Sequence, residues 1–288
     1  MIVISILNSS VSSACNQLSV QQLGSVEMNS MHKGVTKNIR IEKTSGSCSF
    51  IVSFNRGQMM ENYRVLKGVN NEVRYGIYRD TSKQNFLGDE SFGIDSVLKG
   101  DFNQSGYEAK NFTIYFSVDD TQLNKEAGLY RDFVELRLSK TVNKVQELVS
   151  ATQVPIMYYQ QPFYDLTLTS TGASHGGVQH RLDFERLEKG KILGFDILIK
   201  SNAPHSLFFS SQNLGRLRHQ SLPDQFVPYL LKVQGQDIDL RRGEVSFNSN
   251  NFNIDALERL SAQVQIQDVS QAMSGHYRDF ISIVIEAR

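Results

Sequence analysis

The stretch Gly-Leu-Tyr-Arg-Asp-Phe-Val-Glu-Leu-Arg-Leu at residues 128–138 recurs as Gly-His-Tyr-Arg-Asp-Phe-Ile-Ser-Ile-Val-Ile at residues 275–285. Each copy begins with a glycine, continues with Tyr-Arg-Asp-Phe, and ends in a run with apolar residues at every second position. Such alternation is typical of a β-strand that buries one face. Because the copies lie about half a chain apart in 288 residues, they indicate two similar domains, each large enough for its own core.

Three residues at the start of each copy are candidates for a structural or a catalytic role. They are Gly128, Tyr130 and Asp132, and Gly275, Tyr277 and Asp279. A tyrosine at such a corner can bury its ring while its hydroxyl bonds nearby backbone, and the aspartate can accept turn amides. We interpret all six as structural, because they recur in both halves at the entrance to a strand; the alternative is a duplicated active site.

The composition excludes several classes of partner. Lys plus Arg and Asp plus Glu both number 30, so the net charge is zero and neither a nucleic acid nor an anionic membrane is indicated. No run approaches the roughly 18–20 apolar residues of a transmembrane helix, so we expect no membrane insertion.

The N-terminus and the cysteines together indicate export. Residues 1–14 run from an apolar stretch into small polar residues and resemble the tail of a truncated signal segment. The alternative is a flexible cytosolic N-terminus or a first strand. Cys15 and Cys48 are the two cysteines, and in an exported protein they predict a disulfide. In a cytosolic protein they would be two free buried thiols.

Alternation of period two runs from end to end and predicts an all-β chain of antiparallel β-sandwiches. The expected strands are 38–42, 48–54, 73–78, 112–118 and 133–138, then 166–169, 182–187, 192–199, 207–210, 229–240, 262–266 and 280–285. We expect an N-terminal domain at 15–140, a linker or closing strand at 141–162, and a C-terminal domain at 163–288. The linker segment is too apolar for a free tether.

A search for chemistry yields no catalytic or metal constellation. His175 and His180 could chelate a metal, but no third ligand follows at a familiar spacing, which favours a solvated loop. Asp119 and Asp120 lack the alternating oxygen ligands of a calcium loop. There is no nucleophile elbow, no phosphate-binding loop and no zinc-protease motif. We therefore expect that the protein is not an enzyme and that it binds no cofactor.

Each half of the chain carries an ordered set of motif residues, namely Cys48, 75–80, 88–89 and 127–132 in the first half, and 201–202, Leu207, 213–215, 228–229 and 275–279 in the second. Through these residues, both halves resemble the spore coat protein U domain family. These domains are pilins and tip subunits of archaic chaperone–usher pili in bacteria. The resemblance implies immunoglobulin-like sandwiches in tandem, the second lacking its final strand, and export through the periplasm to a pilus at the cell surface.

The resemblance also implies how the subunit is assembled. In that family the missing strand is supplied first by a periplasmic pilus chaperone and then by the next pilin subunit, at an outer-membrane usher. More than twenty residues follow Leu138 before the next obvious strand, whereas three follow Ile285. We therefore expect the first domain to close itself and the second to expose a groove. A chain that starts at Cys15 has no donor segment ahead of it, which predicts a place at the fibre tip.

A tip subunit of this family would be an adhesin for a host or abiotic surface. The candidate binding loops are 57–60, with Met59 and Met60, and 88–93, with Phe92, although both methionines could be core residues. Two alternatives stay open. One is a structural spore-coat or fimbrial subunit without an adhesive role, and the other is a secreted lectin-like β-sandwich.

Overall fold

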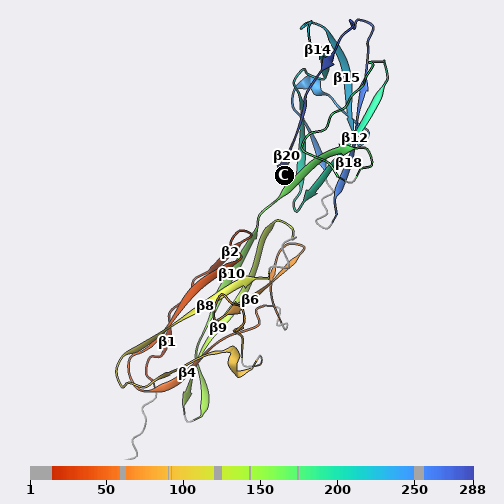
Figure 1. The fold of residues 1–288 in the computed structure, drawn as a ribbon. Helices are drawn as coiled ribbons and strands as arrows, with labels where there is room; N and C mark the ends of the chain where they lie inside the picture. Colours follow the sequence, from red (N-terminus) through yellow and green to blue (C-terminus); the bar gives the residue numbers. More distant parts are fainter. Residues whose placement is uncertain are drawn as a thin grey trace, which may run out of the picture. The chain divides into compact units, whose positions relative to one another are not determined.

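The chain is all-β and divides into two compact units, residues 1–161 and 162–288 (Figure 1). A computed structural model describes residues 15–58, 63–89, 91, 93–119, 125–142, 144–173, 175–249 and 256–288. The signal segment expected at 1–14 lies outside these residues. Within the described ranges there is no α-helix, and no helix is long and apolar enough to cross a membrane. Each unit has its own core, which agrees with two sandwich domains in tandem.

The first unit is built from ten strands. They are β1 (Ser19–Val20), β2 (Val26–Asn29), β3 (Gly34–Lys43), β4 (Cys48–Phe54), β5 (Arg64–Lys67), β6 (Glu72–Tyr78), β7 (Leu98–Phe102), β8 (Glu108–Val118), β9 (Gly128–Val142) and β10 (Val145–Gln160). A 3₁₀ turn, Ile94–Ser96, precedes β7. Hydrogen bonds connect the strands in the order β1-β3-β8-β6-β5-β9-β10-β2, and β4 pairs with β7 and β9.

The described strands of the second unit form two sheets. Its strands are β11 (Tyr164–Ser170), β12 (Ile192–Ser201), β13 (His205–Ser211), β14 (Arg216–His219), β15 (Phe226–Val233), β16 (Gln236–Ile238), β17 (Val245–Ser249), β18 (Glu258–Ile266), β19 (Tyr277–Arg278) and β20 (Ile281–Ala287). A 3₁₀ turn, Leu240–Arg242, lies between β16 and β17. One sheet has the order β11-β12-β18-β15-β14-β19, with β16 on β15, and the other is β17-β13-β20.

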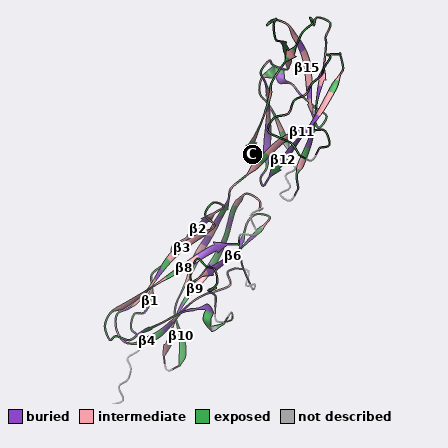
Figure 2. Cartoon of the chain, viewed as in Figure 1, coloured by how far each residue is buried: buried purple, intermediate pink, exposed green. Residues whose placement is uncertain are grey.

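Alternation of side chains explains why these segments form strands with one buried face. Along β9 every second residue from Tyr130 to Leu138 is buried, and the residues between them are half-buried or exposed (Figure 2). The buried face packs on inward residues of β3, β4, β6 and β8 to form the first core. Sheets twisted over such a core give the sandwich that the period-two pattern predicts.

Two of the expected strands are wrong in detail. Residues 182–187 form an irregular segment in which Phe184 is buried and Glu185 has a positive φ of 53°, so the alternation there reflects packing of a loop against the core. The expected strand 229–240 is a hairpin: Gln234 and Gly235 have φ values of 49° and 79° and turn the chain between β15 and β16. Two successive positive φ values are the geometry of a tight hairpin turn.

The segment between the domains belongs mostly to the first unit. β9 extends to Val142, and β10 pairs antiparallel with it from Val145 to Gln160, with a β-bulge between Leu148 and Ser150. β10 also pairs in parallel with β2 along Ile156–Tyr159. Residues 145–160 therefore form a strand between β9 and β2, and the chain passes to the second unit at Gln161–Pro162.

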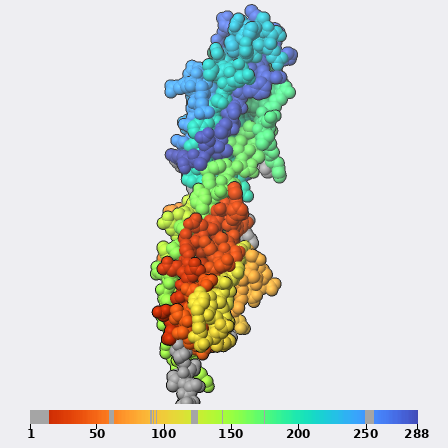
Figure 3. All heavy atoms as spheres, turned by 90° about the vertical axis from the view of Figure 1, so that its left-hand side faces the viewer, coloured from red at the N-terminus to blue at the C-terminus, as the bar shows by residue number. Residues whose placement is uncertain are grey.

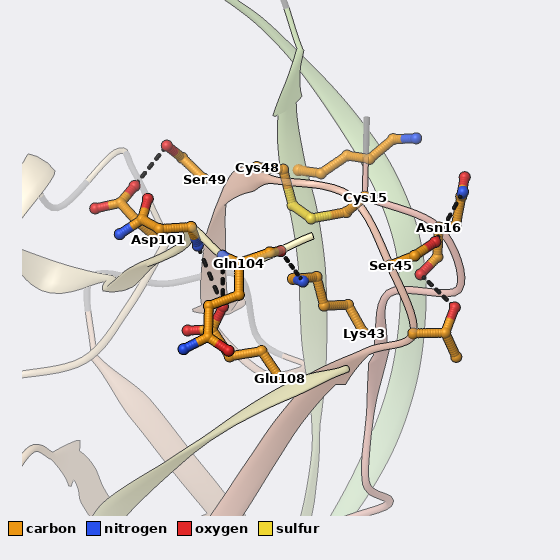
Figure 4. Close-up of a disulfide and its surroundings, with 12 residues drawn as sticks. Cys15, Asn16, Lys43, Ser45, Cys48, Ser49, Asp101, Gln104 and Glu108 are labelled. Carbon is orange, nitrogen blue, oxygen red and sulfur yellow. Dashed lines mark hydrogen bonds between the residues drawn. A yellow bond between two sulfur atoms is a disulfide. The ribbon is translucent and has the colours of Figure 1, made fainter. Parts of the chain in front are cut away.

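Cys15 and Cys48 form a disulfide, as the sequence predicted (Figure 4). Their Cα atoms lie 5.4 Å apart and their sequence separation is 33 residues. Beside it, the buried Lys43 ammonium donates hydrogen bonds of 2.6 Å to the carbonyl oxygens of Gln104 and Gly106. The disulfide thus ties the start of the described chain to the first residue of β4.

Replacing both cysteines with serine should lower the free energy of unfolding of the first domain by about 3–4 kcal/mol, because the closed loop no longer limits the unfolded chain. Urea denaturation of the full chain measures this loss. Reduction of the wild-type protein should give a loss of the same size. An unchanged midpoint in both samples would contradict the prediction.

Candidate functional site

The two copies of the repeated stretch make the same tyrosine corner. The Tyr130 hydroxyl donates to the Glu126 carbonyl oxygen at 2.7 Å, and the Tyr277 hydroxyl donates to the Met273 carbonyl oxygen at 2.9 Å. In each case the acceptor lies four residues earlier in the chain. The Tyr130 ring is 2% exposed, and burial raises the pKa of Tyr130 to about 12. Each tyrosine therefore fixes the turn that leads into its strand.

The aspartate of each copy links this corner to another strand. One carboxylate oxygen of Asp132 accepts the backbone N–H of Gln58 at 3.0 Å, and the other accepts the Tyr75 hydroxyl at 2.6 Å. Tyr75 lies on β6. Burial raises the pKa of Tyr75 well above its ordinary value, and the charge of Asp132 adds to this, so the phenol remains a donor.

Asp279 repeats this arrangement in the second domain. One carboxylate oxygen accepts the backbone N–H of Asn213 at 3.0 Å, and the other accepts the Tyr229 hydroxyl at 2.5 Å and the Ser211 hydroxyl at 2.6 Å. Burial, and then the bond to Asp279, raise the pKa of Tyr229 far above its ordinary value. All acceptor positions of the carboxylate serve the fold, which supports a structural role.

Both corner glycines have a backbone conformation that requires glycine, and Gly275 has a second, steric reason. Gly128 has a φ of 144° and Gly275 a φ of 153°, values that residues other than glycine rarely adopt. At Gly275 a Cβ would also collide with the His219 imidazole. That ring cannot move aside easily, because it accepts the backbone N–H groups of Ser221 and Leu222 at 3.0 Å and bonds the Ser274 carbonyl at 3.2 Å.

The two copies differ in what lies along their outer edge. β9 pairs with β4 and β5 on one side and with β10 on the other, where the register runs from Gly128↔Gln160 to Val142↔Val145. β20 pairs with β13 on one side, from Ile281↔Ser211 to Ala287↔His205. Within the part of the chain that the structure describes, no strand pairs with the other side of β20. We call this side the open edge.

The open edge leaves apolar side chains partly uncovered. Val134, Leu136 and Leu138 of β9 are at most 1% exposed, whereas the residues that correspond to them on β20, Ile281, Ile283 and Ile285, are each only half-buried. On the other face of the strand Phe280 is 60% and Val284 is 44% exposed. In Figure 3 the dark-blue atoms of this C-terminal strand lie open on the surface of the second unit.

In the first domain, β10 covers the surface of β9 that corresponds to the open edge of β20. Val154, Ile156 and Tyr158 of β10 are fully buried and lie opposite Val134, Asp132 and Tyr130 of β9. They fill the space between β9 and β2 with alternate side chains of one strand. The corresponding space beside Ile281, Asp279 and Tyr277 is the candidate functional site, because an unpaired strand edge with partly uncovered apolar residues is chemically suited to bind a β-strand.

Met59, Met60 and Phe92 lie outside the described residues. The His180 ring stacks on Phe195 at a centroid distance of 6.2 Å, while His175 lies in the exposed loop before it. Among the residues the structure describes, no three His, Cys, Asp or Glu side chains come close enough to hold a metal ion.

A polar hollow of about 500 Å³ lies beside the β5–β6 hairpin of the first domain. Its lining includes Tyr63, Asn70, Asn71, Glu72 and Arg74, and the Arg74 guanidinium lies 4.0 Å from the centre of the Tyr63 ring. Sequence patterns did not indicate this hollow, because the alternation along the hairpin does not show that these side chains border a common space.

Comparison with known proteins finds a family model that matches the first domain. Residues 7–137 match the sequence model of the Spore Coat Protein U domain. No curated protein matches the chain.

Solved structures of similar architecture include a chain of the complex between the chaperone CsuC and the tip adhesion subunit CsuE of archaic chaperone–usher Csu pili from Acinetobacter baumannii. It is 11% identical, with a TM-score of 0.45, and the match covers 93% of this chain and 100% of that one. The CupB6 tip adhesin from Pseudomonas aeruginosa is 9% identical, with a TM-score of 0.38 and coverage of 93% and 94%. The CooA pilin subunit from enterotoxigenic Escherichia coli is 15% identical, with a TM-score of 0.36 and coverage of 50% and 98%.

Asp132→Ala should lower the free energy of unfolding of the first domain by about 2–4 kcal/mol, because the Tyr75 hydroxyl and the Gln58 amide lose their acceptor in a buried place. Tyr75→Phe alone should cost about 1 kcal/mol. The double variant should lose less than the sum, since the two groups act on each other. Urea denaturation measures all three.

Asp95→Ala is the matched control, because Asp95 is an exposed aspartate in the same domain. Strict additivity of Asp132→Ala and Tyr75→Phe, or a loss in Asp132→Ala no larger than in Asp95→Ala, would contradict the structural role.

Proposed function

We propose that this chain is a subunit of a bacterial pilus whose second domain is completed by a β-strand of another protein, bound along the open edge of β20. The observation that carries the proposal is the difference between the two copies. The outer side of this strand is covered by β10 in the first domain, whereas in the described part of the second domain no strand pairs with the outer side of β20. The match of residues 7–137 to the Spore Coat Protein U domain model supports it.

The physical basis is strand addition. An unpaired edge offers backbone N–H and C=O groups in the spacing that a second strand requires, and Ile281, Ile283 and Ile285 offer apolar surface to its alternate side chains. Each fully buried side chain of the size of Val154 or Ile156 contributes about 1.5–3 kcal/mol. An uncovered edge of this kind also promotes aggregation, so the subunit needs a partner during export.

The partners follow from this requirement. A periplasmic pilus chaperone covers the open edge after export, and the strand of the next pilin subunit replaces it at an outer-membrane usher. The finished protein then lies at the cell surface as part of the pilus. The disulfide between Cys15 and Cys48 suits this oxidising route.

The tip of the fibre is the position that fits best. The first domain is completed by its own β10, and its N-terminal described residues are used within the domain: Cys15 bonds Cys48, β1 pairs with β3, and β2 pairs with β10. The second domain accepts a strand, and the first is free to present a binding surface to a host or abiotic surface. The chain is then an adhesin with a binding domain in front and a pilin-like domain behind.

A second candidate is a lectin-like activity of the first domain, and the polar hollow beside the β5–β6 hairpin favours it. An aromatic ring, two side-chain amides and charged groups converge there, as polar groups do in ligand sites. Binding of mono- and oligosaccharides to the full chain, lost in Asn70→Ala, would support this function. It is compatible with an adhesin.

A self-completed chain tests the proposed function. Joining a second copy of residues 142–160 directly after Arg288 reproduces the spacing between β9 and β10, because Arg288 corresponds to Thr141. The extended protein should be monomeric, and its second domain should gain roughly 5–9 kcal/mol in free energy of unfolding from the three side chains that become buried. Size-exclusion chromatography and urea denaturation measure the two effects.

The matched control carries serine in place of Val154, Ile156 and Tyr158 in the added copy only. Equal stability of the extended protein and this control would contradict strand addition.

Position in the fibre has its own test in the source bacterium. Immunogold labelling should mark fibre ends, and the protein should copurify with a chaperone in cells that lack the usher. Labelling along the whole fibre would favour a structural subunit without an adhesive role.

A further inference from the structure

A small basic pocket lies on the second domain where β19 gives way to β20. Its volume is about 220 Å³, and its lining includes Arg218, Arg278, Phe280, Gln212 and Gln220. Arg278 and Phe280 immediately precede the open edge. The pocket is therefore next to the place where an incoming strand would pass.

Two like charges face each other in this pocket. Arg218 of β14 and Arg278 of β19 are direct cross-strand partners, an arrangement that like charges make unfavourable. Among the described residues neither guanidinium has a carboxylate within ion-pair distance, and the Arg218 Nε atom donates to the Pro223 carbonyl oxygen at 3.1 Å. The nearby Asp279 carboxylate is engaged by Asn213 and Tyr229.

The neighbouring imidazole adds no positive charge. His219 is 6% exposed, and its Nδ1 atom accepts the backbone N–H groups of Ser221 and Leu222 at 3.0 Å. The remaining ring nitrogen therefore carries the hydrogen and donates to the Ser274 carbonyl oxygen at 3.2 Å. The two arginines thus set the charge of the pocket.

The first domain has a pair of basic residues at the equivalent position, but this pair has a different neighbour. Lys67 of β5 pairs with Arg131 of β9, but Lys67 also lies opposite Glu72 of β6. Its counterpart Arg218 lies opposite Phe226 instead. The second domain therefore lacks the carboxylate that lies next to the basic pair of the first.

We propose that the strand which completes the second domain carries an aspartate or glutamate directly opposite Arg278, and that Arg278 and Arg218 bind this carboxylate. The proposal rests on the proposed function, because it assumes that a strand adds to the open edge in the register of β9 and β10. In that register the position opposite Arg278 is the one that Met157 of β10 occupies opposite Arg131.

The geometry suits a direct contact. Arg278 is exposed, on the face opposite to that of the corner Tyr277, so the facing residue of the incoming strand points the same way. Direct cross-strand neighbours have Cβ atoms about 4.5–5.5 Å apart, well within the reach of arginine and glutamate. The residue two positions earlier on that strand lies opposite Phe280, which is 60% exposed and favours an apolar partner.

The carboxylate would fix the register of the partner as well as its affinity. Alternate apolar residues on the inner face allow a strand to slip by two residues, whereas a single charge opposite Arg278 distinguishes these registers. The proposed partner strand therefore has apolar residues at alternate positions on its inward face. On its outward face it has an apolar residue and, two positions later in the sequence, an aspartate or glutamate.

Binding of labelled peptides to the full chain tests this. The probes copy residues 149–160 with methionine, glutamate or lysine at the position of Met157. The glutamate peptide should bind about threefold to tenfold more tightly than the methionine peptide, and the lysine peptide more weakly, as for a partly exposed ion pair. Fluorescence anisotropy measures the dissociation constants, and the difference should shrink in 0.5 M salt.

Two variants of the chain complete the test. In Arg278→Ala the glutamate and methionine peptides should bind alike, whereas in Arg181→Ala, a matched change at an exposed arginine elsewhere in the same domain, the difference should persist. Equal binding of the three peptides to the wild type, or a difference that survives in Arg278→Ala, would overturn the inference but leave the proposed function standing. Binding of no peptide, together with no stabilisation of the self-completed chain, would overturn both.

Discussion

Pairing of the backbone along one strand edge governs the whole chain. A strand inside a sheet needs a hydrogen-bonding partner on each side, and an apolar face needs a cover. β9 meets both needs through β10, whose side chains from Val154 to Tyr158 fill the space beside it. β20 has the same amino-acid pattern and meets them on one side only in the described structure. The difference in burial between Val134 and Ile281 follows from this one difference in pairing.

The hydrogen bonds of the two tyrosine corners fix the start of each final strand in the same way. Tyr130 and Tyr277 each hold a carbonyl four residues back, and Asp132 and Asp279 each hold a turn amide and the hydroxyl of a tyrosine on another strand. The corner that precedes β20 therefore has the same kinds of hydrogen bond as the corner at the start of β9. What differs lies beyond the corner, at the edge that a partner would cover.

The sequence predicted the features that depend on local pattern. Alternation of apolar residues located most strands, because strand side chains alternate between faces, and the repeated stretch located both corners. It failed at 182–187, where apolar residues in a loop have the same spacing as in a strand, and at 229–240, where Gln234 turns the chain without a proline or a typical turn pair.

Features that depend on tertiary contacts were beyond the reach of the sequence. Asp132 accepts hydrogen bonds from Tyr75 and Gln58, which lie 57 and 74 residues away along the chain. The facing arginines of the second domain lie 60 residues apart and become neighbours through the pairing of β14 with β19. The disulfide was predictable because two cysteines allow one pairing within the chain.

The two edges also differ in how each domain can reach its folded state. β10 begins at Val145, soon after β9 ends at Val142, so the closing hairpin of the first domain forms within the chain and at low loop-closure cost. A strand that reaches β20 from another molecule must associate, and the stability of the second domain then depends on the concentration and affinity of that partner. Under the proposed function, the first domain folds independently, while completion of the second is coupled to assembly. The proposed subunit then combines a first domain that is folded in advance with a joint that closes only in the fibre.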